Sequence, residues 1–196
     1  MEASFWANYQ NIIGFIALCT GIVYVVLATF RLRLCWIFGG ISSACFVVNL
    51  WNAHFFVDAL INVYYLVMAF YGWYWWQSDK AVEDIVSKNK TSFHFYSILC
   101  LFLPALLLGF ILHKFTPTPY PYADAWVGIL SVYATWLTAK KVAQSWFYWI
   151  AADLLAAILY FAKELYFESI LMAVYAFVAV FGFYEWIRIY NKRRYA

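Results

Sequence analysis

Apolar stretches, each about long enough to cross a lipid bilayer, occupy most of this chain. A helix needs roughly 20 apolar residues to cross the hydrocarbon core. Because lipid offers no hydrogen bonds, the backbone groups of a crossing segment must pair within the protein, and a helix pairs them within one segment. The sequence therefore predicts an all-α integral membrane protein with seven transmembrane helices, at about 11–29, 35–51, 56–76, 95–113, 122–139, 144–162 and 167–187.

The charge content agrees with a surface that mostly faces lipid. Charged residues make up 12% of the chain, about half of their usual share in a soluble domain. The net charge of +3 is small and its cations gather at the ends of the apolar stretches, so nucleic acid is not expected as a partner. Four cysteines without C-x-x-C spacing are expected to be buried small apolar residues. The first stretch lacks the basic start of a secretory signal, so a retained helix is expected.

The distribution of lysine and arginine predicts the orientation in the membrane. With seven spans, 11 of the 13 Lys and Arg residues fall on the side of the C-terminus, and only Lys114 and Lys163 fall on the other side. Cytoplasmic loops carry the excess of basic residues. We therefore expect a cytoplasmic C-terminus and an N-terminus outside.

Residues 31–76 and 141–186 align with each other at a constant offset of 110. The matched pairs are Trp36/Trp146, Asp58/Glu168, Tyr65/Tyr175, Ala69/Ala179 and the segments Gly72–Trp76/Gly182–Trp186. Aromatic belts at membrane interfaces and unrelated helix caps are the alternative explanations. Their coincidence at one offset favours a true duplication.

A duplicated unit of three helices predicts a 3+1+3 arrangement. One linker helix between two such units gives both the same direction through the membrane, as in parallel-repeat transporters. The architecture is similar to that of SWEET sugar transporters. We expect a single transport domain, 1–196, with repeat one at about 11–76, a linker helix at about 95–113 and repeat two at about 122–187.

Trp146, Trp149 and Asp153 are the strongest candidates for a binding site. Their spacing places them within about 60° of one helix face, and Asp153 lies about 10 Å deeper in the membrane than Trp146. A carboxylate at that depth costs roughly 3 kcal/mol and usually faces a cavity or a partner. Two indoles and a carboxylate suit a flat heteroaromatic cation. The alternative is two belt tryptophans and an aspartate bonded to a neighbouring helix.

The duplication shows where the two halves differ. Trp149 corresponds to Gly39 and Asp153 to Ser43, so one copy carries small residues where the other carries large or charged ones. Such small residues either leave room for a ligand or allow close helix packing. Asn62 is a further candidate for the cavity, or for a hydrogen bond between helices.

Other polar residues have simpler explanations. Ser131 and Thr135 are expected to bond to their own helix backbone. Asp58, Asp124 and Glu168 stand at predicted helix starts and are interpreted first as caps, and His54, His94 and His113 share no metal-binding spacing. The chain lacks nucleotide-binding and hydrolase motifs such as G-x-x-x-x-G-K-[ST] and G-x-S-x-G. We therefore expect no enzyme activity, no catalytic residue, no cofactor and no metal.

Two segments of the chain resemble the Pnu family of vitamin transporters. These segments are Thr135–Leu137 with Lys140-Lys141, followed by Trp146–Asp153, which is similar to the family motif W-x-x-W-x-x-x-N, with D in some members. The ending Gly72–Trp76 of the third predicted span is also similar to theirs. The resemblance covers essentially the whole chain and places Trp146, Trp149 and Asp153 on the family's substrate motif.

The resemblance implies facilitated diffusion of an unphosphorylated vitamin across the bacterial inner membrane. It also implies a homotrimer whose cargo is trapped inside by a vitamin kinase or pyrophosphokinase. The nicotinamide riboside carriers have Asn where this chain has Asp153. A carboxylate suits the aminopyrimidine of thiamine, so a PnuT-like thiamine carrier is our first expectation and a nicotinamide riboside carrier our second. Riboflavin transport, or a non-transporting sensor or assembly protein, is a lesser alternative.

Overall fold

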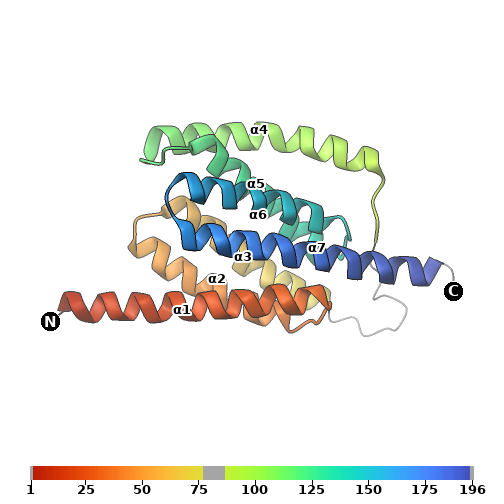
Figure 1. Cartoon of the computed structure of the whole chain (residues 1–196), viewed down its shortest axis with the longest axis horizontal. Coiled ribbons are helices and arrows are strands. Elements are labelled where there is room, and N and C mark those ends of the chain that lie inside the picture. The colour runs from red at the N-terminus through yellow and green to blue at the C-terminus, as the bar shows by residue number, and fades with distance from the viewer. Residues whose placement is uncertain (1, 77–86, 195–196) are drawn as a thin grey trace. The chain divides into compact units, whose positions relative to one another are not determined.

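A computed structural model describes residues 2–76 and 87–194, and these residues are helical apart from short connections. Seven helices follow one another: α1 (Glu2–Thr29), α2 (Cys35–Asn52), α3 (Phe56–Trp75), α4 (Thr91–Phe115), α5 (Pro121–Ala139), α6 (Ser145–Ala162) and α7 (Tyr166–Arg194) (Figure 1). The predicted all-α class and the position of every predicted helix are confirmed. Ser78-Asp79-Lys80, which follows the third predicted span, lies outside the described residues.

Six of the helices in the described ranges are long and apolar enough to cross a membrane, and α5 is not among them. Helix α5 instead has buried positions along its whole length, many of them small or polar: Ala125, Gly128, Ser131, Ala134, Thr135, Leu137, Thr138 and Ala139. A helix that packs against protein on much of its surface need not be apolar all round. The prediction at 122–139 was therefore right about the helix and wrong about its apolar character.

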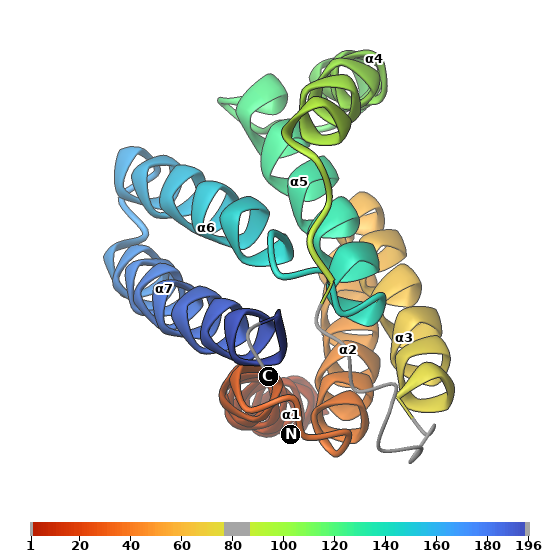
Figure 2. The same cartoon turned by 90° about the vertical axis from the view of Figure 1, so that its right-hand side faces the viewer.

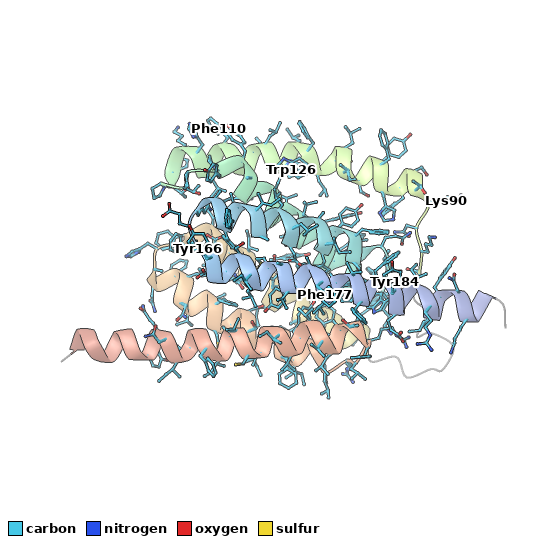
Figure 3. The ribbon with its side chains drawn as sticks, in the orientation of Figure 1. Lys90, Phe110, Trp126, Tyr166, Phe177 and Tyr184 are labelled. Atoms are coloured by element: carbon cyan, nitrogen blue, oxygen red, sulfur yellow. The ribbon has the colours of Figure 1, made fainter. Side chains whose placement is uncertain are left out.

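Large apolar side chains are exposed along the other helices. Phe110 of α4 and Phe177 and Tyr184 of α7 are examples, with between 56% and 68% of their surface exposed (Figure 3). Exposed apolar surface of this extent is rare on soluble monomers. It is the surface expected of helices that face lipid.

The chain divides into two compact units. The N-terminal unit (Met1–Asp84) contains α1 to α3, and the C-terminal unit (Ile85–Ala196) contains α4 to α7. In the N-terminal unit, α2 packs against both α1 and α3. In the C-terminal unit, α6 packs in the same way against α5 and α7, and α4 packs against α5 (Figure 2).

The turn between α1 and α2 has the same conformation as the turn between α5 and α6. Arg31 has φ 58° and Lys141, its counterpart at the offset of 110, has φ 54°. In both turns the next N–H reaches back five residues at 3.0 Å: Leu32 N to Leu27 O and Val142 N to Leu137 O. This is the Schellman pattern of helix ends, which usually has glycine at the left-handed position. A basic residue takes that position in both units.

The turn between α2 and α3 likewise has the same conformation as the turn between α6 and α7. His54 has φ 62° and Glu164, at the same offset, has φ 63°. Again the following N–H reaches back five residues: Phe55 N to Leu50 O at 2.9 Å and Leu165 N to Tyr160 O at 2.8 Å. The segments that align in sequence therefore share their local backbone structure.

A tryptophan seated against a glycine joins α2 to α3 in the N-terminal unit. A Cβ added to Gly72 of α3 would overlap the indole of Trp36 of α2. The same indole meets Trp76 edge-on, with ring centroids 5.4 Å apart and ring planes at 87°. Only glycine allows the ring to lie this close to the α3 backbone.

The C-terminal unit contains the same cluster at the offset of 110. A Cβ on Gly182 of α7 would lie 2.6 Å from the indole of Trp146 of α6. The rings of Trp146 and Trp186 are 5.6 Å apart at 89°. The matched tryptophans and glycines of the sequence thus form matched helix contacts.

We expect Gly72→Ala to destabilise the protein, because the new methyl group would collide with the indole of Trp36. Overpacking of this kind costs about 1–3 kcal/mol. The matched control is Gly40→Ala in the same unit, where a Cβ would make only ordinary contacts, with Ala69 at 3.4 Å and Leu66 at 3.9 Å. Thermal unfolding of the purified variants in detergent gives the comparison. Equal melting temperatures for the two variants would contradict the proposed packing.

Candidate functional site

Trp146 begins the predicted binding stripe on α6, and its ring faces α7. It is 3% exposed and is held between Gly182 and Trp186, as described above. Its indole N–H is buried and has no hydrogen-bond partner among the described residues, and the same holds for Trp36 in the N-terminal unit. Trp146 therefore belongs first to the packing that both units share.

Trp149, one turn further along α6, faces α5 instead. Its Nε1 donates a hydrogen bond of 3.1 Å to Oγ1 of Thr138. Its half-buried ring also packs against a buried cluster of four residues, Ala134, Leu137, Val142 and Tyr148. The two tryptophans of the stripe therefore contact different neighbouring helices and do not form a stacked pair.

Asp153 completes the stripe, one turn deeper than Trp149. It is only 9% exposed. No hydrogen bond or ion pair to its carboxylate is found within the described ranges, while the phenol of Tyr175 on α7 lies close enough to interact with it electrostatically. A buried carboxylate without a partner is costly in a membrane-spanning helix. Asp153 is therefore a candidate binding residue, as the sequence predicted.

The small residues predicted as the counterpart of this stripe lie in the N-terminal unit. A Cβ on Gly39 would lie 2.8 Å from the ring of Tyr24, so a side chain of α1 fills the space above this glycine. Ser43 is buried on the same helix. Asn62 donates from Nδ2 to the carbonyl oxygen of Asp58, four residues earlier in α3, at 2.9 Å. Of the two explanations for the glycine, close helix packing is the one observed.

A set of polar contacts supports the Trp149 region from α4. The imidazole Nδ1 of His94 and the hydroxyl of Tyr148 are 2.9 Å apart. Tyr148 meets Tyr133 edge-on at 4.9 Å, and the Tyr133 hydroxyl donates to Ser97 Oγ at 2.7 Å. Neither His94, which shares no metal-binding spacing with the other histidines, nor the two tyrosines were among the predicted site residues.

The remaining polar predictions have mixed outcomes. Ser131 and Thr135 bond to their own helix as expected, to the carbonyl oxygens of Val127 at 2.8 Å and of Ser131 at 2.7 Å. Asp124 pairs instead with Lys163 at the far end of α6, at 2.7 Å, and accepts a hydrogen bond from Thr118. Its carboxylate thus ties the connection before α5 to the end of α6, which the interpretation as a cap did not anticipate.

Thr138 is the residue of this site that the sequence analysis missed. It continues the spacing of Ser131 and Thr135 along α5, which would have placed its hydroxyl on the same helix face. That spacing gives no indication of Trp149 as the partner, because the contact joins two helices.

Comparison with known proteins places this site in a family context. Residues 11–188 match the protein family described as nicotinamide mononucleotide transporter. The nicotinamide riboside transporter PnuC of Escherichia coli strain K12 is 19% identical over 200 residues, which cover 88% of this chain and 84% of that protein. The riboflavin/roseoflavin transporter RibM of Streptomyces davaonensis is 26% identical over 129 residues, which cover 62% of this chain and 59% of that protein.

One solved structure, a crystal structure of the vitamin B3 transporter PnuC, has a similar fold. The TM-score is 0.74 at 18% sequence identity, with 97% of this chain and 87% of that chain covered. At this identity the likeness concerns the fold.

We expect Tyr148→Phe to lower stability, because it removes the hydroxyl that His94 contacts. The loss of one such hydrogen bond costs about 1 kcal/mol. Tyr184→Phe is the control, since the Tyr184 side chain is 68% exposed. Reversible unfolding in mixed micelles measures both variants. A Tyr148→Phe variant as stable as Tyr184→Phe would argue against a supporting contact.

Proposed function

The chain belongs to the nicotinamide mononucleotide transporter family, and on this basis we propose that it carries an unphosphorylated vitamin with a cationic heteroaromatic ring across the membrane. As a member of this family it is a multi-pass membrane transporter. The family match covers residues 11–188, which include all the residues discussed for the site.

The buried carboxylate of Asp153 is the observation that best supports the proposed cargo. It is 9% exposed, lies one turn from the half-buried ring of Trp149 and interacts electrostatically with the phenol of Tyr175. A cationic ring would stack on the indole and neutralise the carboxylate. A neutral ligand would leave the buried charge uncompensated, which is unfavourable.

Nicotinamide riboside is the first candidate and thiamine the second. Both carry a cationic ring, and the Escherichia coli relative is named for nicotinamide riboside. Thiamine adds an aminopyrimidine whose amino group suits a carboxylate acceptor, which is why the sequence alone favoured it. The Streptomyces relative is named for riboflavin. Riboflavin has no cationic ring, so Asp153 supports it less.

The same proposal includes the 3+1+3 arrangement and the orientation. In it, α1–α3 and α5–α7 cross the membrane in the same direction, and α4 links them. The turns and the tryptophan–glycine contacts that recur at the offset of 110 support this arrangement. The excess of Lys and Arg on one side supports a cytoplasmic C-terminus in a bacterial inner membrane.

Transport by proteoliposomes of the purified protein tests the function. Labelled nicotinamide riboside should enter in a saturable manner and stop at equal concentrations inside and outside, as expected for facilitated diffusion. Unlabelled thiamine should compete more strongly than riboflavin, because only thiamine shares the cationic ring. Flux of none of the three vitamins through folded protein would refute the transport proposal, and accumulation driven by a proton gradient would refute facilitated diffusion.

Asp153→Asn tests the carboxylate directly. We expect the dissociation constant of the cationic vitamin to rise by about tenfold or more, since a charged hydrogen bond contributes about 1.5–3 kcal/mol. Riboflavin affinity should change far less. The control is Glu168→Gln, which removes one negative charge from an exposed position at the start of α7. Titration calorimetry in detergent measures each variant, and an unchanged affinity in Asp153→Asn would make Asp153 structural.

A further inference from the structure

Thr138 of α5 holds the indole of Trp149 by a buried hydrogen bond. Its side chain is 1% exposed, so water does not compete for the hydroxyl. Oγ1 accepts from Nε1 of Trp149 at 3.1 Å and donates to the carbonyl oxygen of Ala134 at 2.9 Å. A hydroxyl has one proton to donate. Since the Ala134 carbonyl takes that proton, a lone pair of the oxygen is left to accept from the indole.

These contacts fix the Trp149 ring on two sides. The N–H edge is tied to Thr138, and the ring packs against the cluster of Ala134, Leu137, Val142 and Tyr148. Trp149 nevertheless remains half-buried, so part of its ring is still accessible. A ring that is anchored at one edge and accessible elsewhere is suited to stack on a flat ligand with little loss of side-chain freedom.

The arrangement is specific to the C-terminal unit. At the offset of 110, Thr138 corresponds to Ala28, and the pair Ala134/Trp149 corresponds to Tyr24/Gly39. In the N-terminal unit the ring thus comes from the first helix and covers a glycine of the second. In the C-terminal unit the ring comes from the second helix and covers an alanine of the first.

One aromatic ring therefore fills the space between α1 and α2, and another fills the space between α5 and α6. Packing alone accounts for a ring at this level in both units. It does not account for the hydrogen bond that Thr138 accepts from Trp149, which the N-terminal unit lacks because Ala28 and Gly39 have no polar side chain. The bond accompanies the ring that lies one turn from Asp153.

We propose that Thr138 is a positioning residue, which sets the orientation in which Trp149 receives the ring of the transported vitamin. This inference rests on the proposed function. It assigns Trp149 as the ring that meets the vitamin and Trp146 as part of the shared packing. The alternative is that Thr138 only fastens α5 to α6.

The first test compares variants of α5. Thr138→Val keeps the shape of the side chain and removes the acceptor, so the dissociation constant of nicotinamide riboside or thiamine should rise about three- to tenfold. Thr138→Ser restores the hydroxyl and should return the affinity close to that of the wild type. Thr135→Val is the matched control, because Thr135 is also buried and its hydroxyl bonds only to its own helix, at Ser131.

A double-mutant cycle with Trp149→Phe separates positioning from fastening. Phenylalanine keeps an aromatic ring but has no N–H, so Thr138→Val should have no further effect on affinity in that background. An effect of equal size in both backgrounds, or a lower melting temperature with unchanged affinity, would overturn the proposal. If Thr138→Val does not fold, Thr138→Ala removes the same acceptor and completes the same cycle.

A measurement without any vitamin distinguishes this inference from the proposed function. In ¹⁵N-indole NMR spectra of the protein in detergent, the Trp149 signal is the one lost in Trp149→Phe. That signal should move in Thr138→Val and stay in Thr135→Val. An unmoved signal would refute the hydrogen bond itself. A moved signal, with no binding of any of the three vitamins by the wild type, would refute the proposed function and with it the positioning role.

Discussion

The contact on which each unit depends is an indole seated against a glycine. Trp36 against Gly72 joins α2 to α3, and Trp146 against Gly182 joins α6 to α7. In lipid no hydrophobic force drives helices together, so close approach at small residues has to supply the attraction. Because the ring lies where a side chain would otherwise be, this contact fixes both the distance and the rotation of the two helices. The paired left-handed turns at Arg31 and Lys141 bring α2 and α6 into position for it.

The candidate site arises where the two units depart from this common plan. Trp146 keeps the position of Trp36, whereas Trp149 and Asp153 replace Gly39 and Ser43. The exchange of Tyr24 and Gly39 for Ala134 and Trp149 keeps one aromatic ring between the helices and moves it to the other helix. The ring then lies on the same helix face as the buried carboxylate of Asp153. The two units thus share a packing framework and differ at these positions.

Much of this could be predicted from the sequence because it depends on local patterns. The span expected at 35–51 is a helix over Cys35–Asn52, and that expected at 122–139 is a helix over Pro121–Ala139. Ser131 and Thr135 bond to their own helix, which is decided within one turn. Other features, which the sequence missed or left open, involve contacts between distant segments. The ion pair of Asp124 with Lys163 and the Tyr24 ring above Gly39 each join two helices, and one sequence cannot show which helix faces which residue.

The sequence by itself determined the class of protein, the helices and the duplication, because apolar length, charge distribution and a constant offset are properties of the linear chain. It also placed Trp146, Trp149 and Asp153 on one face of one helix, since helical geometry alone fixes that. Only the tertiary structure decided what the residues on that face contact. It turned Trp146 towards Gly182 and Trp149 towards Thr138, and it left the carboxylate of Asp153 without a hydrogen bond within the described ranges. The reason is physical: the direction of a ring and the pairing of a buried charge depend on neighbouring helices, whose positions are set by packing.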